Sequence, residues 1–205
     1  MLKCHLNLID KPVLTVIAGC NGSGKSSFSS ALSPPKIPPF DYDKEFLRFY
    51  SKEPDSELKE TICHNKAREL LKKMVEESIA NQRSFTYETN FNSTPLYWPE
   101  KFRKAEFGLR LFYFCLNSTE EAKRRVQIRV ENGGHYVPDN EVVKRYYEGY
   151  HNLNLHWRYF DETFLFETSA YKSEPQHIIS IIDQTVEIEA PIPEYLISLI
   201  PFILK

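Results

Sequence analysis

The chain has 205 residues, a net charge of −2 at pH 7, 41% hydrophobic residues and 26% charged residues, which suits one soluble globular domain over residues 1–205. The near-neutral charge argues against a general affinity for nucleic acid or for an anionic membrane surface. The sequence shows no signal-peptide pattern, no membrane-spanning run and no paired cysteine spacing for a metal, so we expect a protein of the reducing cytoplasm.

A phosphate-binding motif follows the first predicted strand, Val13–Ala18. Residues 19–26 match G-x-x-x-x-G-K-[ST] at every fixed position, and residues 27–32 can form a helix. Glycines let the backbone wrap around an anion, and the helix N-terminus adds partial positive charge. The alternative is a chance glycine-rich turn, which the preceding strand disfavours. We expect a nucleotide to contact Gly19, Cys20, Asn21, Gly22, Ser23, Gly24, Lys25, Ser26 and Ser27. Among these, Lys25 would be catalytic on the phosphates and Ser26 would bind Mg²⁺.

After a proline-rich loop, a short second strand predicted over residues 39–43 ends in an acidic cluster. A carboxylate there can accept the proton of an acceptor hydroxyl and hold that hydroxyl in line with the γ-phosphate. Alternation along a strand turns Asp41 and Asp43 to the same side, and Asp43 lies further toward the open edge. We expect Asp43 to be the base and Asp41 to contact the substrate. Asp41 is the alternative base, and an aspartate here can instead cap a helix that begins near Lys44.

A helix predicted over residues 57–82 leads to a third strand, predicted over residues 84–91. Glu88, Thr89 and Asn90 break the apolar run where this strand leaves the core. Such side chains can hold the hydroxyls of a substrate or a Mg²⁺-bound water. The alternative is an exposed strand end with turn-forming polar residues.

Two basic helices, predicted over residues 119–131 and 139–155, follow an apolar fourth strand at residues 109–116. A fifth strand is predicted over residues 163–168. From about residue 171 to 205 we expect an extension with a hairpin, or a strand and a turn, and a short apolar helix. Strands that alternate with helices indicate an α/β fold with a mostly parallel central sheet and helices on both faces. Ligands of such sheets bind beyond the carboxyl ends of the strands, where the phosphate-binding motif lies.

The two basic helices predict a lid over about residues 118–155, because a Gly-Gly hinge joins them. Arg125 and Arg129 are four residues apart on one face of the first helix, and the second helix carries Arg145. Arginine pairs with two phosphate oxygens and stays charged, so these side chains suit a triphosphate. His135 beside the hinge can donate to a phosphate oxygen. The alternative is a solvated pair of charged helices.

Together these motifs resemble the zeta-toxin family of P-loop kinases, and more narrowly its short, single-domain branch of zeta-toxin-like ATPases. The resemblance covers about residues 13–170. It rests on Gly19–Ser26, Asp41–Asp43, Tyr87–Thr89, Arg125 with Arg129, Gly133-Gly134-His135-x-Val137-Pro138, and Arg145-Tyr146 through Asn152-Leu153. The chain is shorter than the larger toxins, so the resemblance supports the kinase chemistry better than the identity of the sugar.

The resemblance implies a kinase that uses ATP or GTP with Mg²⁺ to phosphorylate a sugar hydroxyl, with UDP-N-acetylglucosamine as the best-known acceptor. It implies that Asp43 is the base, that Glu88 and Thr89 hold the substrate, and that Arg129 and Arg145 act on the γ-phosphate. Arg125 is the alternative catalytic arginine. A small helical antitoxin that blocks the nucleotide site is the implied partner.

Two other functions remain open. A nucleoside or nucleotide kinase shares the lid architecture and differs only in its acceptor. A nucleotide-dependent switch or mechanical ATPase is the alternative from another class. The fourth strand does not end in the acidic pair that motor ATPases carry, which favours a kinase.

Overall fold

The structure is a computed structural model and describes residues 11–35, 37–134 and 136–204. Within these ranges six strands form one sheet in the order β2-β1-β3-β4-β5-β6. They are β1 (Val13–Ala18), β2 (Phe85–Thr89), β3 (Gly108–Cys115), β4 (Glu162–Glu167), β5 (Gln176–Ile182) and β6 (Thr185–Ile188). Strands β1 to β4 pair in parallel, and β5 and β6 add an antiparallel hairpin at one edge. The predicted α/β class with a mostly parallel sheet is confirmed.

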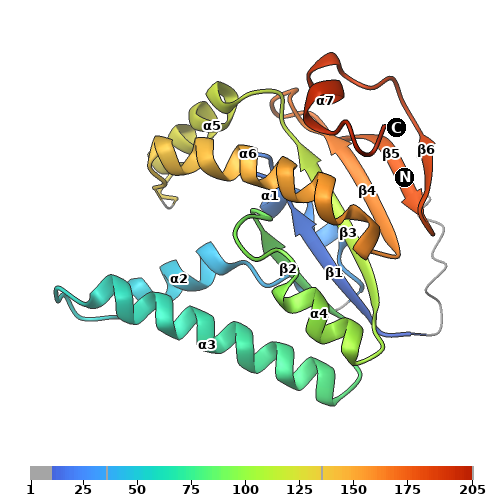
Figure 1. Ribbon diagram of the computed structural model, residues 1–205. Coiled ribbons are helices and arrows are strands. Elements are labelled where there is room, and N and C mark those ends of the chain that lie inside the picture. Colours follow the sequence, from blue (N-terminus) through green and yellow to red (C-terminus); the bar gives the residue numbers. More distant parts are fainter. Residues whose placement is uncertain (1–10, 36, 135, 205) are drawn as a thin grey trace.

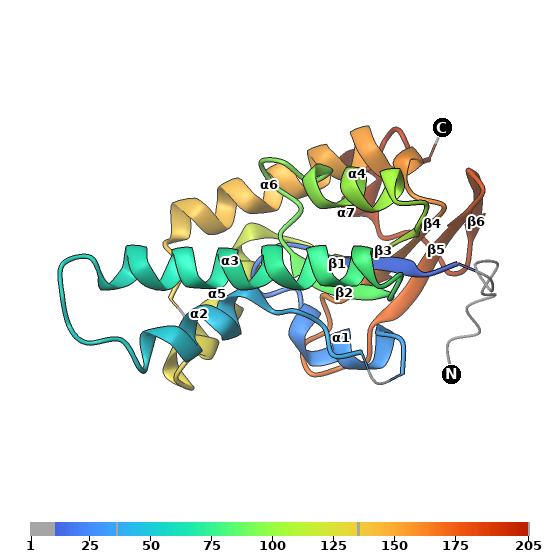
Figure 2. The same cartoon turned by 90° about the horizontal axis from the view of Figure 1, so that it is seen from below.

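Helices lie on both faces of this sheet (Figure 1, Figure 2). One face carries α4 (Tyr97–Lys104), α6 (Asp139–His156) and α7 (Glu194–Leu199), and the opposite face carries α1 (Lys25–Leu32). The helices α2 (Tyr42–Tyr50) and α3 (Lys59–Ala80) project together as an arm beyond β2, and α5 (Thr119–Glu131) lies beside α6. A 3₁₀ turn, Trp157–Tyr159, links α6 to β4. In the described part of the chain, no helix combines the length and the apolar character needed to cross a membrane.

Each face of the sheet has its own apolar core. Under α4, α6 and α7 the larger core includes Leu109, Leu111 and Tyr113 of β3. On the α1 side, Phe112 and Phe114 of the same strand join a smaller, aromatic core. All eight residues of β3 are buried, because alternate side chains enter opposite cores. This explains why the strand is an almost unbroken apolar run in the sequence.

The short strand predicted over residues 39–43 is wrong beyond Phe40. The backbone of Phe40 forms an isolated parallel bridge with Tyr87, and α2 begins at Tyr42. Asp41 is the N-cap of this helix, since its carboxylate accepts a hydrogen bond of 3.1 Å from the backbone N–H of Lys44. Such a cap satisfies an N–H group that has no partner inside the helix. Asp43 therefore stands in the first turn of a helix and does not alternate along a strand.

Helix α6, the second helix of the predicted lid, is fastened to the backbone of Leu116 just after β3. Tyr146 Oη donates to the carbonyl oxygen of Leu116 at 2.9 Å. The hydroxyl of Tyr150 accepts from the N–H of Leu116 at 2.9 Å and donates to its carbonyl at 3.0 Å. Both tyrosines lie on α6 and are buried. Helix α6 is thus held firmly over the carboxyl ends of the strands, where the predicted site lies.

Candidate active site

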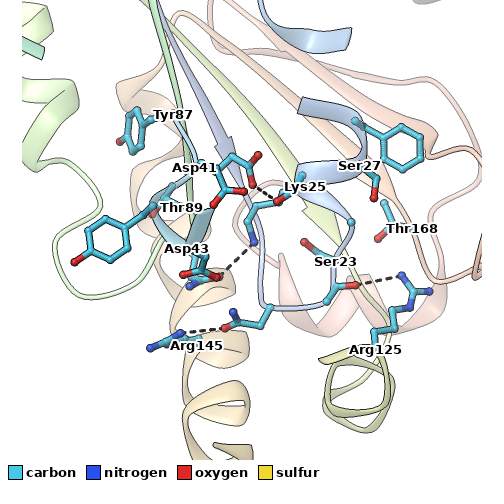
Figure 3. Close-up of a pocket in the computed structure, with 18 of the residues that line it drawn as sticks. Ser23, Lys25, Ser27, Asp41, Asp43, Tyr87, Thr89, Arg125, Arg145 and Thr168 are labelled. Atoms are coloured by element: carbon cyan, nitrogen blue, oxygen red, sulfur yellow. Dashed lines mark hydrogen bonds between the residues drawn. The ribbon is translucent and has the colours of Figure 1, made fainter. Parts of the chain in front are cut away.

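A cavity of about 1030 Å³ opens beyond the ends of β1 and β2. Its walls include residues of the phosphate-binding loop, the start of α2, the end of β2, helices α5 and α6, and most of the segment 168–174. Figure 3 shows Lys25 between two groups of residues, with Asp41 and Asp43 on one side and Arg125 and Thr168 on the other. Motifs that are far apart in the sequence, from the glycine-rich loop to the two helices of the predicted lid, therefore meet at one site.

The glycine-rich loop depends on glycine at two close contacts. At Gly19, with φ of +143°, an added Cβ would lie 2.6 Å from the carbonyl oxygen of Phe114. At Gly22, with φ of +80°, it would lie 2.9 Å from the carbonyl oxygen of Ala122 on α5. Both contacts are too short for a side chain, and both backbone conformations are ones that L-residues rarely adopt. The loop is thereby packed between β3 and the first lid helix.

Lys25 lies at the centre of the loop. Its Nζ donates to the carbonyl oxygens of Gly19 at 2.7 Å and Cys20 at 3.0 Å, and to Asn90 Oδ1 at 3.3 Å. Burial lowers the pKa of Lys25, and the negative charge of Glu88 opposes this shift. Cys20 itself is buried, which raises the pKa of its thiol to about 11. The loop thus offers one ammonium group at the point where the predicted phosphates would lie.

Ser26 and Glu88 form an oxygen pair beside this ammonium. Ser26 Oγ donates a hydrogen bond of 2.6 Å to Glu88 Oε2. Burial raises the pKa of Glu88, while the hydrogen bond from Ser26 acts in the opposite direction. Mg²⁺ prefers hard oxygen ligands and usually takes only one or two from the protein, with phosphates and water as the others. The two residues therefore fit a Mg²⁺ ion that is bound together with a triphosphate.

The two aspartates differ in their surroundings. Asp41 caps α2 and lies near Glu88, whose pKa its charge helps to raise. Asp43 has no part in the cap, and its Oδ2 lies 3.6 Å from Arg129 Nη1 across the cavity. Both line the cavity, but only Asp43 faces the predicted lid.

The three predicted lid arginines line the cavity at different points. Arg125 is held against its outer side, where it donates to the carbonyl oxygens of Gly22 at 3.3 Å and Ser169 at 2.8 Å. Arg145 Nη1 donates to Asn21 Oδ1 at 3.3 Å. Figure 3 shows these two guanidinium groups approaching the loop from different helices. Arg129 faces Asp43.

The predicted substrate-side residues lie at the end of β2. Thr89 Oγ1 accepts a hydrogen bond of 3.0 Å from the N–H of Phe91, and Asn90 contacts Lys25. Both line the cavity together with Glu88. His135, which was predicted to reach a phosphate oxygen, lies outside the described residues.

The cavity also has a wall that the sequence analysis missed, on the α2–α3 arm. Tyr42 Oη lies 3.1 Å from His64 Nδ1, and both residues line the cavity with Arg68. His64 and Arg68 are four residues apart on α3, so they share one helix face. That spacing was visible in the sequence. Its functional meaning was not, because the arm's position beside the phosphate-binding loop is a tertiary feature.

Comparison with solved structures shows similar folds at low sequence identity. A protein of Chloroflexus aurantiacus to which a kinase activity is ascribed has 20% identity and a TM-score of 0.53, over 65% of this chain and 75% of its own. A chain of the AvrRxo1-ORF1:AvrRxo1-ORF2 complex, also solved with ATP, has 14% identity and a TM-score of 0.61, over 87% of this chain and 61% of its own. A chain of the PezAT toxin-antitoxin system of Streptococcus pneumoniae has 10% identity and a TM-score of 0.58, over 93% of this chain and 77% of its own.

Comparison with curated protein sequences gives no significant match. At the level of families the match is extensive, because the model of the Zeta toxin family covers residues 3–175. This range includes the glycine-rich loop, both aspartates and the three arginines. The chain belongs to the Zeta toxin family, whose kinase-like fold it shares.

Proposed function

We propose that this protein is a kinase that transfers the γ-phosphate of ATP or GTP to a hydroxyl of a small molecule, most specifically to the amino sugar of a nucleotide sugar such as UDP-N-acetylglucosamine. The observation that carries the proposal is the position of Asp43. Its carboxylate lies in the same cavity as the phosphate-binding loop and faces Arg129 at 3.6 Å. A base, a phosphate cradle and cationic groups around one space are the parts that phosphoryl transfer needs.

The cations have distinct roles in this proposal. Lys25 binds the β- and γ-phosphates from inside the loop, and Arg129 and Arg145 neutralise the charge that spreads over the moving phosphoryl group. Arg125 serves the nucleotide rather than the γ-phosphate, because its guanidinium is bound to Gly22 and Ser169 on the outer side of the loop. The contact between Arg129 and Asp43 favours Arg129 over Arg125 as the catalytic arginine.

Asp43 acts as the general base. The acceptor hydroxyl gives its proton to the Asp43 carboxylate, the acceptor oxygen forms a bond to the γ-phosphorus, and the bond from that phosphorus to the β–γ bridging oxygen breaks. ADP or GDP leaves with the electron pair of that bond. Asp41 is a weaker candidate for the base, because its carboxylate already caps α2. Its role in the proposal is to contact the acceptor.

Ser26 and Glu88 would hold Mg²⁺, which supplies charge neutralisation between the β- and γ-phosphates when it is bound. Ser26 provides a hydroxyl oxygen, and the Glu88 carboxylate at 2.6 Å from it keeps that hydroxyl oriented. Thr89 and Asn90 complete the acceptor side. Glu88 therefore has two roles in the proposal. It orients the Ser26 hydroxyl at the metal site, and it forms part of the wall of the acceptor site.

The acceptor side suits a molecule larger than a simple sugar. His64, Arg68 and Trp98 also line the cavity, and we assign them to its acceptor side. An arginine and an aromatic ring are suitable partners for phosphate and for a base, respectively. These features support a nucleotide-bearing acceptor, and they equally support the second candidate, a nucleoside or nucleotide kinase.

The family and the likeness to a chain of the PezAT system also support a toxin role in the cytoplasm, with a small helical antitoxin as the partner. Expression of the wild type in bacteria is then expected to arrest growth, whereas Asp43→Ala is not. Equal growth of the two strains would argue for a housekeeping kinase.

The central test incubates the purified protein with ATP or GTP, Mg²⁺ and a panel of nucleotide sugars, nucleosides and nucleotides. Mass spectrometry is expected to find one acceptor that gains a single phosphoryl group. Lys25→Ala, which removes the ammonium of the loop, is the matched inactive control. Nucleotide hydrolysis without any phosphorylated product would refute the kinase assignment. Preference for a nucleoside or nucleotide over every nucleotide sugar would select the second candidate.

A further inference from the structure

One face of α6 runs from the nucleotide side of the cavity to its acceptor side. Arg145, Gly149 and Asn152 are four and three residues apart, so they lie in one row along the helix. Arg145 contacts Asn21 of the glycine-rich loop at 3.3 Å. Two turns further on, Asn152 Nδ2 donates to the carbonyl oxygen of Phe91 at 2.9 Å. The helix therefore bridges the two sides over about 10 Å.

Gly149, between these two contacts, lets the helix lie directly on the segment after β2. A Cβ atom here would be 2.8 Å from Tyr113 Oη and 3.0 Å from the carbonyl oxygen of Asn90. Even the weak contacts between a carbon and an oxygen are normally longer, at about 3.3 to 3.6 Å. Any side chain at position 149 would push α6 and the Asn90 backbone apart.

The backbone that α6 contacts is in an unusual conformation. Phe91 has φ of +57°, although it is a bulky residue that rarely enters the left-handed region. Its ring is fully buried and packs edge-on against Tyr113 with the centroids 6.2 Å apart. A backbone of this kind persists only where its surroundings hold it. The surroundings here are the core under Phe91 and the amide of Asn152.

We propose that Gly149 and Asn152 are positioning residues. They hold the turn at Thr89–Phe91, keep Asn90 beside Lys25, and fix the acceptor side relative to Arg145 on the same helix. Neither residue lines the cavity, so their action goes through the turn. The proposal that they hold the turn stands on the contacts alone, whereas the consequence for transfer rests on the proposed function.

The first experiment compares Asn152→Ala with His151→Ala, an exposed neighbour on the same helix. Hydrogen exchange of residues 89–95 is expected to quicken by about two- to tenfold in Asn152→Ala, as the loss of one hydrogen bond predicts, and not in His151→Ala. With the acceptor identified by the panel, kcat/KM is expected to fall by roughly 10- to 100-fold. The Kd for ATP should stay within about twofold, because the glycine-rich loop is not altered.

The second experiment separates stability from positioning. Gly149→Ala is expected to lower Tm, although this change inside a helix ordinarily stabilises it. The hydroxyl of Tyr113 is buried and makes no hydrogen bond to the described residues, so Tyr113→Phe should behave like the wild type. The double variant Gly149→Ala/Tyr113→Phe removes the closer clash but keeps the one with Asn90. It should recover most of the Tm while its kcat/KM stays at least about tenfold low.

Unchanged hydrogen exchange in Asn152→Ala would overturn the proposal whether or not an acceptor is found. Faster exchange with wild-type transfer would also overturn it, because the turn would then not matter for the reaction. Recovery of both Tm and kcat/KM in the double variant would reduce Gly149 to a packing residue. Failure of the whole panel to yield a product would refute the proposed function instead, and the exchange data would still decide whether α6 holds the turn.

Discussion

Replacing Asp43 with asparagine is expected to stop phosphoryl transfer and leave nucleotide binding nearly intact. Asparagine keeps the shape of the side chain but cannot take the proton of the acceptor hydroxyl. A general base contributes about 10²- to 10⁴-fold, which corresponds to about 2.7 to 5.5 kcal/mol in the barrier. The ion pair with Arg129 is 3.6 Å long and its partners are 40% and 37% exposed. Its loss should therefore change stability by about 1 kcal/mol at most.

The matched control is Asp41→Asn, two residues away on the same turn. Asparagine is as good an N-cap as aspartate, so α2 should keep its start. Transfer is followed by mass spectrometry and ATP binding by equilibrium titration. In Asp43→Asn the Kd for ATP should stay the same or fall slightly, since a negative charge near the triphosphate has been removed. Turnover above about one tenth of the wild type in Asp43→Asn would refute the assignment. Loss of transfer in Asp41→Asn, together with retained transfer in Asp43→Asn, would make Asp41 the base.

Two further predictions concern the loop and the lid. Gly19→Ala should abolish ATP binding in the same titration, because its Cβ would meet the backbone of β3 at 2.6 Å. Gly133 also has a positive φ, of +83°, but its Cβ would meet nothing within 4 Å, so Gly133→Ala should keep ATP binding. Binding by Gly19→Ala would contradict the described loop. The pKa of Glu121 is lowered from 4.5 to about 2, mainly by the hydrogen bond from Arg124 and further by the one from Arg125. This stabilisation is complete above pH 4.5 and disappears toward pH 2, so the Tm advantage of the wild type over Glu121→Gln should shrink over that range. A constant difference in Tm would count against it.

The glycine-rich loop could be predicted from the sequence because its physical requirements are local. Residues 13–18 are all buried and, apart from Thr15, apolar, and they form β1 with the predicted bounds. The glycines follow at the positions where the backbone needs positive φ, and the helix begins at Lys25. The positive φ angles lie at the loop's own glycines, so the motif can be recognised without knowledge of its distant partners. The same holds for the predicted hairpin near the C-terminus, where strand, turn and strand are consecutive.

The acidic cluster could not be read in the same way. A strand and a capped helix start are both compatible with Phe40-Asp41-Tyr42-Asp43. The sheet offers Phe40 one bridge only, whereas the cap gives Asp41 a definite partner in the N–H of Lys44. Local hydrogen bonding therefore decided the conformation. Asp43 still reaches the cavity, but from the first turn of a helix.

Residues 97–104 show why a short helix escapes prediction. The helix α4 includes Pro99, buries only Pro99 and Phe102, and has no side-chain cap. Its eight residues carry too few apolar positions for a helical period to be recognised. The helix forms because Phe102 packs against Phe85 of β2 and Phe107 before β3. That burial depends on the assembled sheet, so the tertiary contacts determine the local structure.

The lid arginines illustrate the limit for the site itself. Their spacing predicted that Arg125 and Arg129 share one face of α5, and they do, but one turn of a helix is enough to separate their environments. Arg125 lies 91% buried between the loop and Ser169, whereas Arg129 opens onto Asp43. The four-residue spacing determines that both arginines lie on one face of α5. The position of α5 relative to the glycine-rich loop determines which of the two guanidinium groups faces the predicted phosphate site. That position is set at Gly22, where only the absence of a side chain lets α5 approach the loop. Gly22 occupies a variable position of the phosphate-binding motif. In the proposed mechanism it therefore decides which arginine can act on the γ-phosphate.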